Sequence, residues 1–248
     1  METIGIIPAR YQSTRLAGKV LMEVAGKPLL QHVYERSRKA KLLDALWIAT
    51  DDVRVKEAAC SFGAEVVMTS PTHISGTDRI AEVVKELPVK WVVNIQADEP
   101  LVAPSMIDLL VETLQGEKEE AGVATLYRPL RRLVDREDLA NPNIVKVVMD
   151  QKGYALYFSR TQIPFYRKSA FSKLPEYHKH LGFYAYRKET LLRMASMPPS
   201  PLERAEGLEQ LRLLENGEKI RLVESPFNTI GVDTHEDLEK VRKILERK

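Results

Sequence analysis

The stretch that decides the fold is Trp91-Val92-Val93-Asn94-Ile95-Gln96-Ala97-Asp98-Glu99-Pro100. Its first half is nearly all apolar, as expected for a β-strand that is covered on both faces. Its second half turns abruptly polar. Such strands are typical of parallel sheets, and open α/β sheets bind ligands beyond the carboxyl ends of their strands. We therefore expect residues 96–100 to border a ligand site.

The residues that precede this strand alternate short β-branched runs with longer helical patterns. Further strands are expected at 3–8, 45–50 and 65–68, and helices at 28–40, 53–62 and 78–87. This alternation is the signature of a sheet with helices on its faces. The predicted fold class is therefore α/β, with a mostly parallel central sheet flanked by helices.

The pattern changes after Gln115. Runs at 122–127, 144–150, 154–158 and 182–186 look like strands with few helices between them. We expect a mixed or antiparallel extension that forms a smaller lobe. The chain then continues with an expected helix at 208–214, a strand at 220–224 and a helix that opens after Asp233-Thr234.

Bulk composition excludes several classes of protein. The chain has 248 residues, 44% of them hydrophobic, and a formal charge of only +2, so we expect neither a general nucleic-acid binder nor a membrane-surface protein. It lacks a signal-peptide pattern and any run of about 18 apolar residues, which predicts a cytoplasmic protein without membrane insertion. The single cysteine, Cys60, is expected to be a buried structural thiol.

The first loop carries three cations, Arg10, Arg15 and Lys19, together with hydroxyls such as Ser13. Cations and free backbone amides that follow a first strand are suited to a triphosphate. The alternative is that these cations only solvate a surface loop. The glycine spacing matches neither the dinucleotide fingerprint nor the Gly-Lys-Ser/Thr loop, so both of those nucleotide classes lose support.

Carboxylates follow two of the apolar runs. Asp98 at a strand end suits magnesium, which takes a few hard oxygens plus phosphate and water. Its alternative is a turn-forming aspartate before a proline. Asp233 has the same character, although spacing alone favours a helix cap. The segment Ser75-Gly76-Thr77-Asp78-Arg79 could bind an anion at a helix start, or Thr77 or Asp78 could simply cap that helix.

In the second half of the chain, polar side chains gather beside expected strands. Arg160, His180 and Arg212 could complement an acidic substrate. The alternatives are Tyr184 in the core, His180 in a turn, and Glu209 with Arg212 on an exposed helix face.

Taken together and in this order, these segments resemble the 3-deoxy-manno-octulosonate (Kdo) cytidylyltransferases over nearly the whole chain. The sequence departs from that pattern at Ala17, where relatives commonly have proline, and at Thr161-Gln162. The markers are Ser13-Thr14-Arg15-Leu16, Ser75-Gly76-Thr77-Asp78-Arg79, Asn94-Ile95-Gln96-Ala97-Asp98-Glu99-Pro100, His180-Leu181-Gly182, Ser200-Pro201-Leu202-Glu203, Leu208-Glu209-Gln210-Leu211-Arg212 and Gly231-Val232-Asp233-Thr234.

The resemblance implies a nucleotide-diphosphosugar transferase fold and transfer of CMP from CTP to Kdo, with release of pyrophosphate, for lipopolysaccharide biosynthesis. It implies one domain over 1–248, in which 1–115 mainly binds nucleotide, about 120–200 forms a sugar-binding and dimerisation lobe, and 201–248 returns to the core. The protein would be a homodimer.

The resemblance also implies residue roles. Magnesium would be held by Asp98 and Asp233, which replaces the cap reading of Asp233, and Lys19 and Arg15 would join them in catalysis by stabilising the leaving group. Nucleotide would be bound by Pro8, Ala9, Arg10, Ser13, Lys19, Ser75, Arg79, Gln96 and Asp98. Sugar would be bound by Gln96, Arg160, His180, Tyr184, Glu209 and Gln210.

Three other functions compete with this one. A cytidylyltransferase for another acidic sugar, such as a sialic acid, would use the same fold. A nonenzymatic nucleotide-binding protein is compatible with the fold but would not need so many reactive side chains. A dinucleotide-dependent oxidoreductase is disfavoured by the missing glycine fingerprint.

Overall fold

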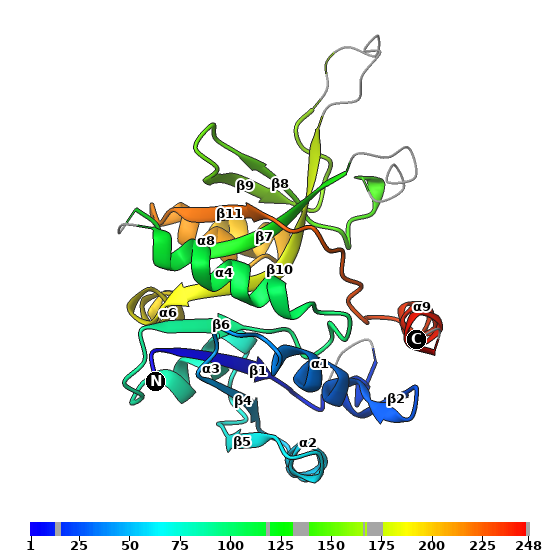
Figure 1. Cartoon of the computed structure of the whole chain (residues 1–248). Helices are drawn as coiled ribbons and strands as arrows, with labels where there is room; N and C mark the ends of the chain where they lie inside the picture. Colours follow the sequence, from blue (N-terminus) through cyan, green and yellow to red (C-terminus); the bar gives the residue numbers. More distant parts are fainter. Residues whose placement is uncertain (13–15, 118–119, 131–138, 166, 168–175, 247–248) are drawn as a thin grey trace.

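The computed structural model describes residues 1–12, 16–117, 120–130, 139–165, 167 and 176–246 (Figure 1). In these ranges the chain forms a nine-stranded sheet with helices on both faces and a two-stranded sheet of β2 (Glu23–Val24) and β3 (Lys27–Pro28). The large sheet contains β1 (Thr3–Pro8), β4 (Ala45–Thr50), β5 (Glu65–Met68), β6 (Trp91–Asn94), β7 (Val123–Leu130), β8 (Lys146–Met149), β9 (Ala155–Ser159), β10 (Tyr177–Arg187) and β11 (Ile220–Glu224).

The sheet is mixed, in the order β11-β7-β10-β6-β1-β4-β5. Strands β6, β1, β4 and β5 run parallel to one another, whereas β10 is antiparallel to both β6 and β7. The carboxyl ends of β1 and β6 therefore meet at one edge, where a ligand site is expected. The prediction of an α/β fold with a mixed or antiparallel extension is confirmed.

Two apolar clusters cover the two faces of the sheet. On β1, Ile7 belongs to one cluster and Ile4 and Ile6 to the other, because alternate residues of a strand point to opposite faces. The first cluster takes its helical residues from α1 (Leu29–Ser37), α2 (Val53–Ser61) and α4 (Pro104–Gly116), and the second from α3 (Gly76–Val84), α6 (Lys188–Ser196) and α8 (Gln210–Glu215).

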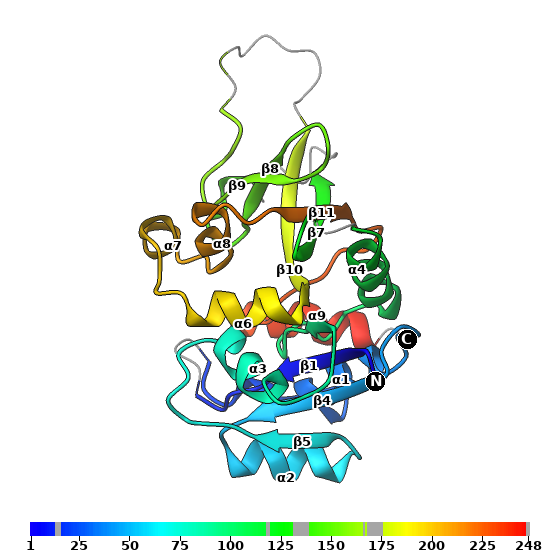
Figure 2. The same ribbon diagram turned by 90° about the vertical axis from the view of Figure 1, so that its left-hand side faces the viewer.

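The carboxyl-terminal helix α9 (His235–Glu246) forms a third cluster. Leu238 and Val241 of α9 pack with Val24 of β2 and Leu29 of α1, so the end of the chain returns to the first loop (Figures 1 and 2). This return brings Asp233, just before α9, back to the edge of the sheet where β1 ends.

The lobe extends the sheet beyond β10. Strand β8 pairs with β10 and with β9, both antiparallel, and the pair stands at the top of Figure 1. The strands foreseen at 144–150 and 154–158 correspond to β8 and β9. Sequence reasoning missed α4 and α6, although the spacing of Met106, Ile107, Leu110 and Leu114, all buried in α4, carries a helical signal.

Two expectations about single features have different outcomes. Cys60 is exposed, so the expectation of a buried thiol is wrong. The inward face of α2 is formed by Val55 and Ala59, and the next residue along a helix points about 100° away from its neighbour. No described helix combines the length and apolar character that crossing a bilayer requires.

Candidate active site

A cavity of about 350 Å³ opens at the carboxyl ends of β1 and β6. Its size falls within the range of small-molecule sites, roughly 300–1,000 Å³. It is lined by residues from the first loop, the α3 amino terminus, the end of β6, the start of α8 and the segment before α9: Pro8, Arg10, Lys19, Val20, His73, Ile74, Ser75, Gly76, Arg79, Gln96, Ala97, Asp98, Glu209 and Asp233.

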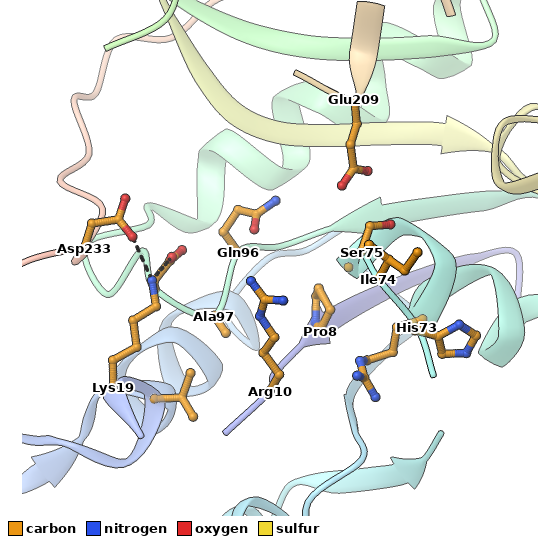
Figure 3. A pocket seen from close by; sticks show the side chains of 14 residues that line it. Pro8, Arg10, Lys19, His73, Ile74, Ser75, Gln96, Ala97, Glu209 and Asp233 are labelled. Carbon is orange, nitrogen blue, oxygen red and sulfur yellow. Dashed lines mark hydrogen bonds and ion pairs between the residues drawn. The ribbon is translucent and has the colours of Figure 1, made fainter. Parts of the chain in front are cut away.

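Lys19 lies between two carboxylates at one end of this pocket (Figure 3). Its Nζ is 2.6 Å from Oδ2 of Asp98 and 3.0 Å from Oδ1 of Asp233, and it also donates to the carbonyl oxygen of Val232 at 3.0 Å. Burial alone would lower the pKa of Lys19, but the charges and hydrogen bonds of Asp98 and Asp233 outweigh it and raise the pKa. Lys19 is therefore a firmly charged cation.

The backbone holds Asp98 and Asp233 together. The amide of Val232 donates to the carbonyl oxygen of Asp98 at 2.9 Å, which joins the end of β6 to the segment before α9. The first turn of α9 is held by Asp237, which accepts from the Thr234 amide and hydroxyl. The carboxylate of Asp233 is thus directed to Lys19. Spacing alone had favoured a role for Asp233 as the cap of the helix that follows.

Two carboxylates that already share one cation suit a divalent metal. Asp98 and Asp233 are hard oxygen donors, and both carboxylates meet at the Lys19 ammonium. Among the described residues, no group of three or more His, Cys, Asp or Glu could hold a metal. A site with two carboxylates is what magnesium uses when substrate phosphates and water complete its shell.

Glu99, next to Asp98, contributes less charge than the sequence suggests. Burial, followed by the neighbouring charge of Asp98, raises the pKa of Glu99 to about 8. Its Oε2 atom is buried and accepts no hydrogen bond within the described residues. The neutral form of Glu99 is therefore favoured at neutral pH.

The other end of the pocket is formed by the start of α3. Ser75 is the N-cap residue of α3, since its hydroxyl accepts from the Asp78 amide at 3.1 Å. The expectation that Thr77 or Asp78 caps this helix is therefore wrong. Arg79 is 3% exposed and pairs with Asp51 at 3.1 Å, so its guanidinium is fixed at the pocket wall.

His73 and Ile74 also line this end, and sequence reasoning missed both. The imidazole Nε2 of His73 makes a close hydrogen-bond contact with the carboxylate of Glu82 of α3, which holds the ring at the pocket rim. The hydrogen bond from His73 is the main cause that lowers the pKa of Glu82. The nearness of His73 to Ser75-Gly76, from which only Ile74 separates it, was the available signal.

Gln96 and Glu209 face the pocket from the side of the lobe (Figure 3). The amide of Gln96 donates to the carbonyl oxygen of Gly182 at 3.2 Å, and Glu209 accepts from the Thr77 hydroxyl at 2.7 Å. Burial raises the pKa of Glu209, against the opposing hydrogen bond from Thr77. Glu209 thus places a carboxyl group on a part of the pocket wall that is shielded from water.

Four expected sugar-binding residues lie outside the pocket lining: Arg160, His180, Tyr184 and Gln210. His180 is buried against Phe158 and Tyr184, and burial lowers its pKa to about 3. Its ring is therefore neutral at physiological pH. Arg212 pairs with Glu203 at 2.5 Å and donates to two carbonyl groups, so it is not presented to a substrate.

The remaining expected residues belong to the first loop. Arg10 is exposed and its side chain points into the middle of the pocket, beside Pro8 (Figure 3). Ala9 is buried, and its amide donates to the carbonyl oxygen of Ala49 at 2.8 Å, so it can act only through its backbone. Ser13 and Arg15 lie outside the described residues.

The fold and the site define an α/β protein with a pocket at the carboxyl ends of parallel strands. At one end of this pocket a lysine lies between two carboxylates, and the walls of the pocket are polar and basic. Comparison with known proteins narrows this class. Residues 4–220 match the cytidylyltransferase family. The 3-deoxy-manno-octulosonate cytidylyltransferase of Syntrophobacter fumaroxidans is 51% identical over 99% of this chain and 97% of its own.

Two further relatives cover the whole chain. The 3-deoxy-manno-octulosonate cytidylyltransferase of Geobacter sulfurreducens is 48% identical over 99% of this chain and 100% of its own. A solved CMP:2-keto-3-deoxy-manno-octonic acid synthetase in complex with CTP superposes with a TM-score of 0.92 at 40% identity, covering 100% of this chain and 99% of that one. This chain therefore belongs to the 3-deoxy-manno-octulosonate cytidylyltransferase family, as its sequence motifs indicated.

Proposed function

We propose that this protein transfers CMP from CTP to Kdo, giving CMP-Kdo and pyrophosphate. The observation that carries the proposal is the Lys19 ammonium shared by Asp98 and Asp233, at 2.6 and 3.0 Å, in a pocket that also presents Arg10. A reaction between two anions needs such an arrangement, because cations must offset their repulsion. The names of the full-length relatives supply the substrates.

CTP would lie along the wall formed by the first loop and the start of α3. Arg10 and Lys19 are the described cations suited to the triphosphate, while Ser75 and Arg79 border the opposite end. The phosphates of the nucleotide would point towards Lys19, and the rest of the nucleotide towards Ser75 and Arg79. By resemblance to the family, Pro8, Ala9, Ser13, Gln96 and Asp98 complete the nucleotide site, and Arg15 assists the leaving group.

Asp98 and Asp233 would hold a magnesium ion, since their carboxylates already share one cation. When bound, magnesium supplies Lewis-acid stabilisation of phosphate charge. The ammonium of Lys19 would then turn from the carboxylates to the phosphate oxygens. Lys19 would thus bind the nucleotide and stabilise the charge that develops on the departing pyrophosphate.

The sugar would bind between Asp98 and the lobe, where Gln96 and Glu209 already face the pocket. Glu209 and Gln96, which line the pocket, suit the hydroxyl groups of the acid. By resemblance to the family, Gln210 and Tyr184, which lie outside the lining, would join them. Arg160 uses three of its five N–H bonds on backbone carbonyls, which leaves donors for a carboxylate. His180, being neutral, would serve by hydrogen bonding.

The reaction is an in-line displacement at the α-phosphorus. The anomeric hydroxyl oxygen of Kdo forms a bond to the α-phosphorus, the bond from that phosphorus to the bridging oxygen of pyrophosphate breaks, and the hydroxyl proton passes to solvent. Such transfers depend mainly on positioning and charge stabilisation. The residues named above supply both.

We also propose that the chain works as one domain, with 1–115 mainly for the nucleotide, about 120–200 as the sugar-binding and dimerisation lobe, and 201–248 returning to the core. By family resemblance, it would be a cytoplasmic homodimer of lipopolysaccharide biosynthesis. Size-exclusion chromatography with light scattering tests the dimer.

The activity itself is tested by pyrophosphate release with CTP and magnesium, comparing Kdo, N-acetylneuraminate and no sugar, with UTP as the nucleotide control. Release only with CTP and Kdo is the expected result. Release with N-acetylneuraminate instead would keep the chemistry and change the acceptor. Silence with every pair would contradict the proposed function.

A further inference from the structure

Lys146, the first residue of β8, is a fully buried lysine that plays no part in the mechanism above. Its Nζ donates to the carbonyl oxygens of Asn141 at 3.0 Å, Ile144 at 2.6 Å and Arg160 at 2.5 Å. Lysines are almost never fully buried without partners, and three carbonyls match the three N–H bonds of an ammonium. Lys146 thus ties the segment before β8 to the end of β9.

Arg160 continues this connection. Its amide donates to Oε2 of Glu206 at 2.9 Å, and its Nε donates to the Glu206 carbonyl oxygen at 2.6 Å. Its two Nη atoms donate to the carbonyl oxygens of Pro142 and Gly207. Glu206 is therefore held by both the backbone and the side chain of Arg160, the same residue whose carbonyl group Lys146 binds.

The connection ends in the pocket. Glu206 is the last residue of α7 (Pro201–Glu206), and Gly207 ends that helix with a left-handed φ of 62°. Glu209 follows two residues later, lines the pocket and accepts from Thr77 at 2.7 Å. A shift of Arg160 would move the Glu206–Gly207 turn and, with it, the carboxylate that faces the ligand.

We propose that Lys146 is a positioning residue for the acceptor sugar: it fixes Arg160, and through Arg160 the turn that places Glu209. The inference rests on the proposed function, because it assigns this wall to the sugar. Lys146 itself is absent from the pocket lining, and the nucleotide wall belongs to other elements. Loss of Lys146 should therefore act on one substrate and spare the other.

The test uses the full chain in three variants. Lys146→Met keeps the length of the side chain and removes the ammonium. Lys152→Met, the same substitution at an exposed lysine of the same lobe, is the matched control. Glu206→Met breaks the next link at a partly exposed site, because it removes both carboxylate oxygens that accept from Ser159 Oγ and from the Arg160 amide. It serves even if Lys146→Met does not fold.

Steady-state kinetics with each substrate varied, together with amide hydrogen exchange, give the readouts. In Lys146→Met and Glu206→Met, we expect KM for Kdo to rise about 10-fold or more, towards the 10²-fold effect of a misplacement of about 1 Å, with KM for CTP unchanged. The Leu211 and Arg212 amides, bonded to Leu208 and Glu209, should exchange faster. Lys152→Met should match the unmodified protein.

An unchanged KM for Kdo in the folded variants, or equal changes in KM for both substrates, would overturn the inference. If the unmodified protein gives no turnover with CTP and Kdo, the proposed function fails first. The positioning claim is then judged by exchange alone, and exchange of Leu211 and Arg212 at the unmodified rate would refute it.

Discussion

The ammonium of Lys19 lies 2.6 Å from Oδ2 of Asp98 and 3.0 Å from Oδ1 of Asp233, so two carboxylates share one cation. A cation that leaves this position must be exchanged for another, because Asp98 and Asp233 repel each other when both are charged. Under the proposed mechanism, nucleotide and metal binding would therefore be coupled through Lys19, which would pair with the carboxylates without ligand and with phosphates when nucleotide is bound.

Replacing Lys19 with Met should separate the role of Lys19 as partner of the two carboxylates from its role towards the phosphates. Without the competing ammonium, the carboxylate pair should bind Mn²⁺, as a probe for Mg²⁺, more tightly in the absence of nucleotide. Turnover should fall by about 10²-fold, as for loss of one group that stabilises developing charge. Electron paramagnetic resonance of Mn²⁺ and steady-state kinetics measure the two effects. Lys27→Met, at a half-exposed pair with Glu35, is the control, and unchanged Mn²⁺ affinity would contradict the competition.

Replacing Asp98 with Asn should lower turnover by at least about 10²-fold at saturating magnesium, with the fold intact. The amide keeps the shape but loses the charge that holds Lys19 or a metal. Turnover and the thermal unfolding midpoint are measured beside Glu112→Gln, an exposed carboxylate on α4. Near-normal turnover in the Asn variant would remove Asp98 from the mechanism.

The parallel half of the fold was predictable because its signals are local. The apolar run before Gln96 and the alternation of short strands with helices indicate a sheet of parallel strands joined by helices. Such connections allow only a few strand orders. The lobe was harder, since β10 runs for 11 residues and pairs with three strands that no local pattern connects. Pairing across such sequence distances depends on tertiary packing.

For the site, residue types at strand ends could be named, but their partners could not. Asp233 looked like a cap because Thr234 and Asp237 carry a cap signal beside it, and only the return of α9 to the first loop brings it to Lys19. Arg212 looked like an exposed cation because its partner Glu203 is brought near by the turn at Gly207. His73 was missed for the same reason: its partner Glu82 lies in the second turn of α3.

Gly18 is predicted to set the position of Lys19. Its φ of 69° is left-handed, and a Cβ there would lie 3.1 Å from the Tyr11 ring. Gly18→Ala should destabilise the fold by about 1–2 kcal/mol and also raise KM for CTP, because the ring or Lys19 must shift. Gly63→Ala has a similar φ of 80° with open space around it, so it should give strain without a change in KM. An equal KM for CTP in both variants would show that Gly18 does not set the position of Lys19.

Removing one partner of the buried pair of Arg212 and Glu203 is predicted to lower the free energy of unfolding more than removing both partners. Arg212→Met leaves the carboxylate of Glu203, 8% exposed, without its guanidinium and should cost about 3–5 kcal/mol. The double variant Glu203→Gln with Arg212→Met should recover part of that loss, since no uncompensated charge remains. Urea unfolding of the single and double variants measures the coupling, and strictly additive losses would argue against a desolvated ion pair.

His180 predicts how stability depends on pH. Its folded pKa of about 3 lies below the ordinary value of 6.5, so between these values the unfolded chain binds a proton that the folded chain excludes. The contribution of neutral His180 is complete above pH 6.5 and is lost as pH falls towards 3. At pH 5 the loss should be about 2 kcal/mol relative to neutral pH.

His180→Gln keeps a hydrogen-bonding group near Thr125, 3.0 Å from the native ring, but cannot titrate. The stability difference between this variant and the unmodified protein should therefore shrink as pH falls from neutral to about 5. Carboxylates affect both proteins alike and cancel in the difference. His235→Gln, the same substitution at an exposed position, is the matched control. A pH-independent difference for His180→Gln would mean that the buried ring accepts a proton in the folded state.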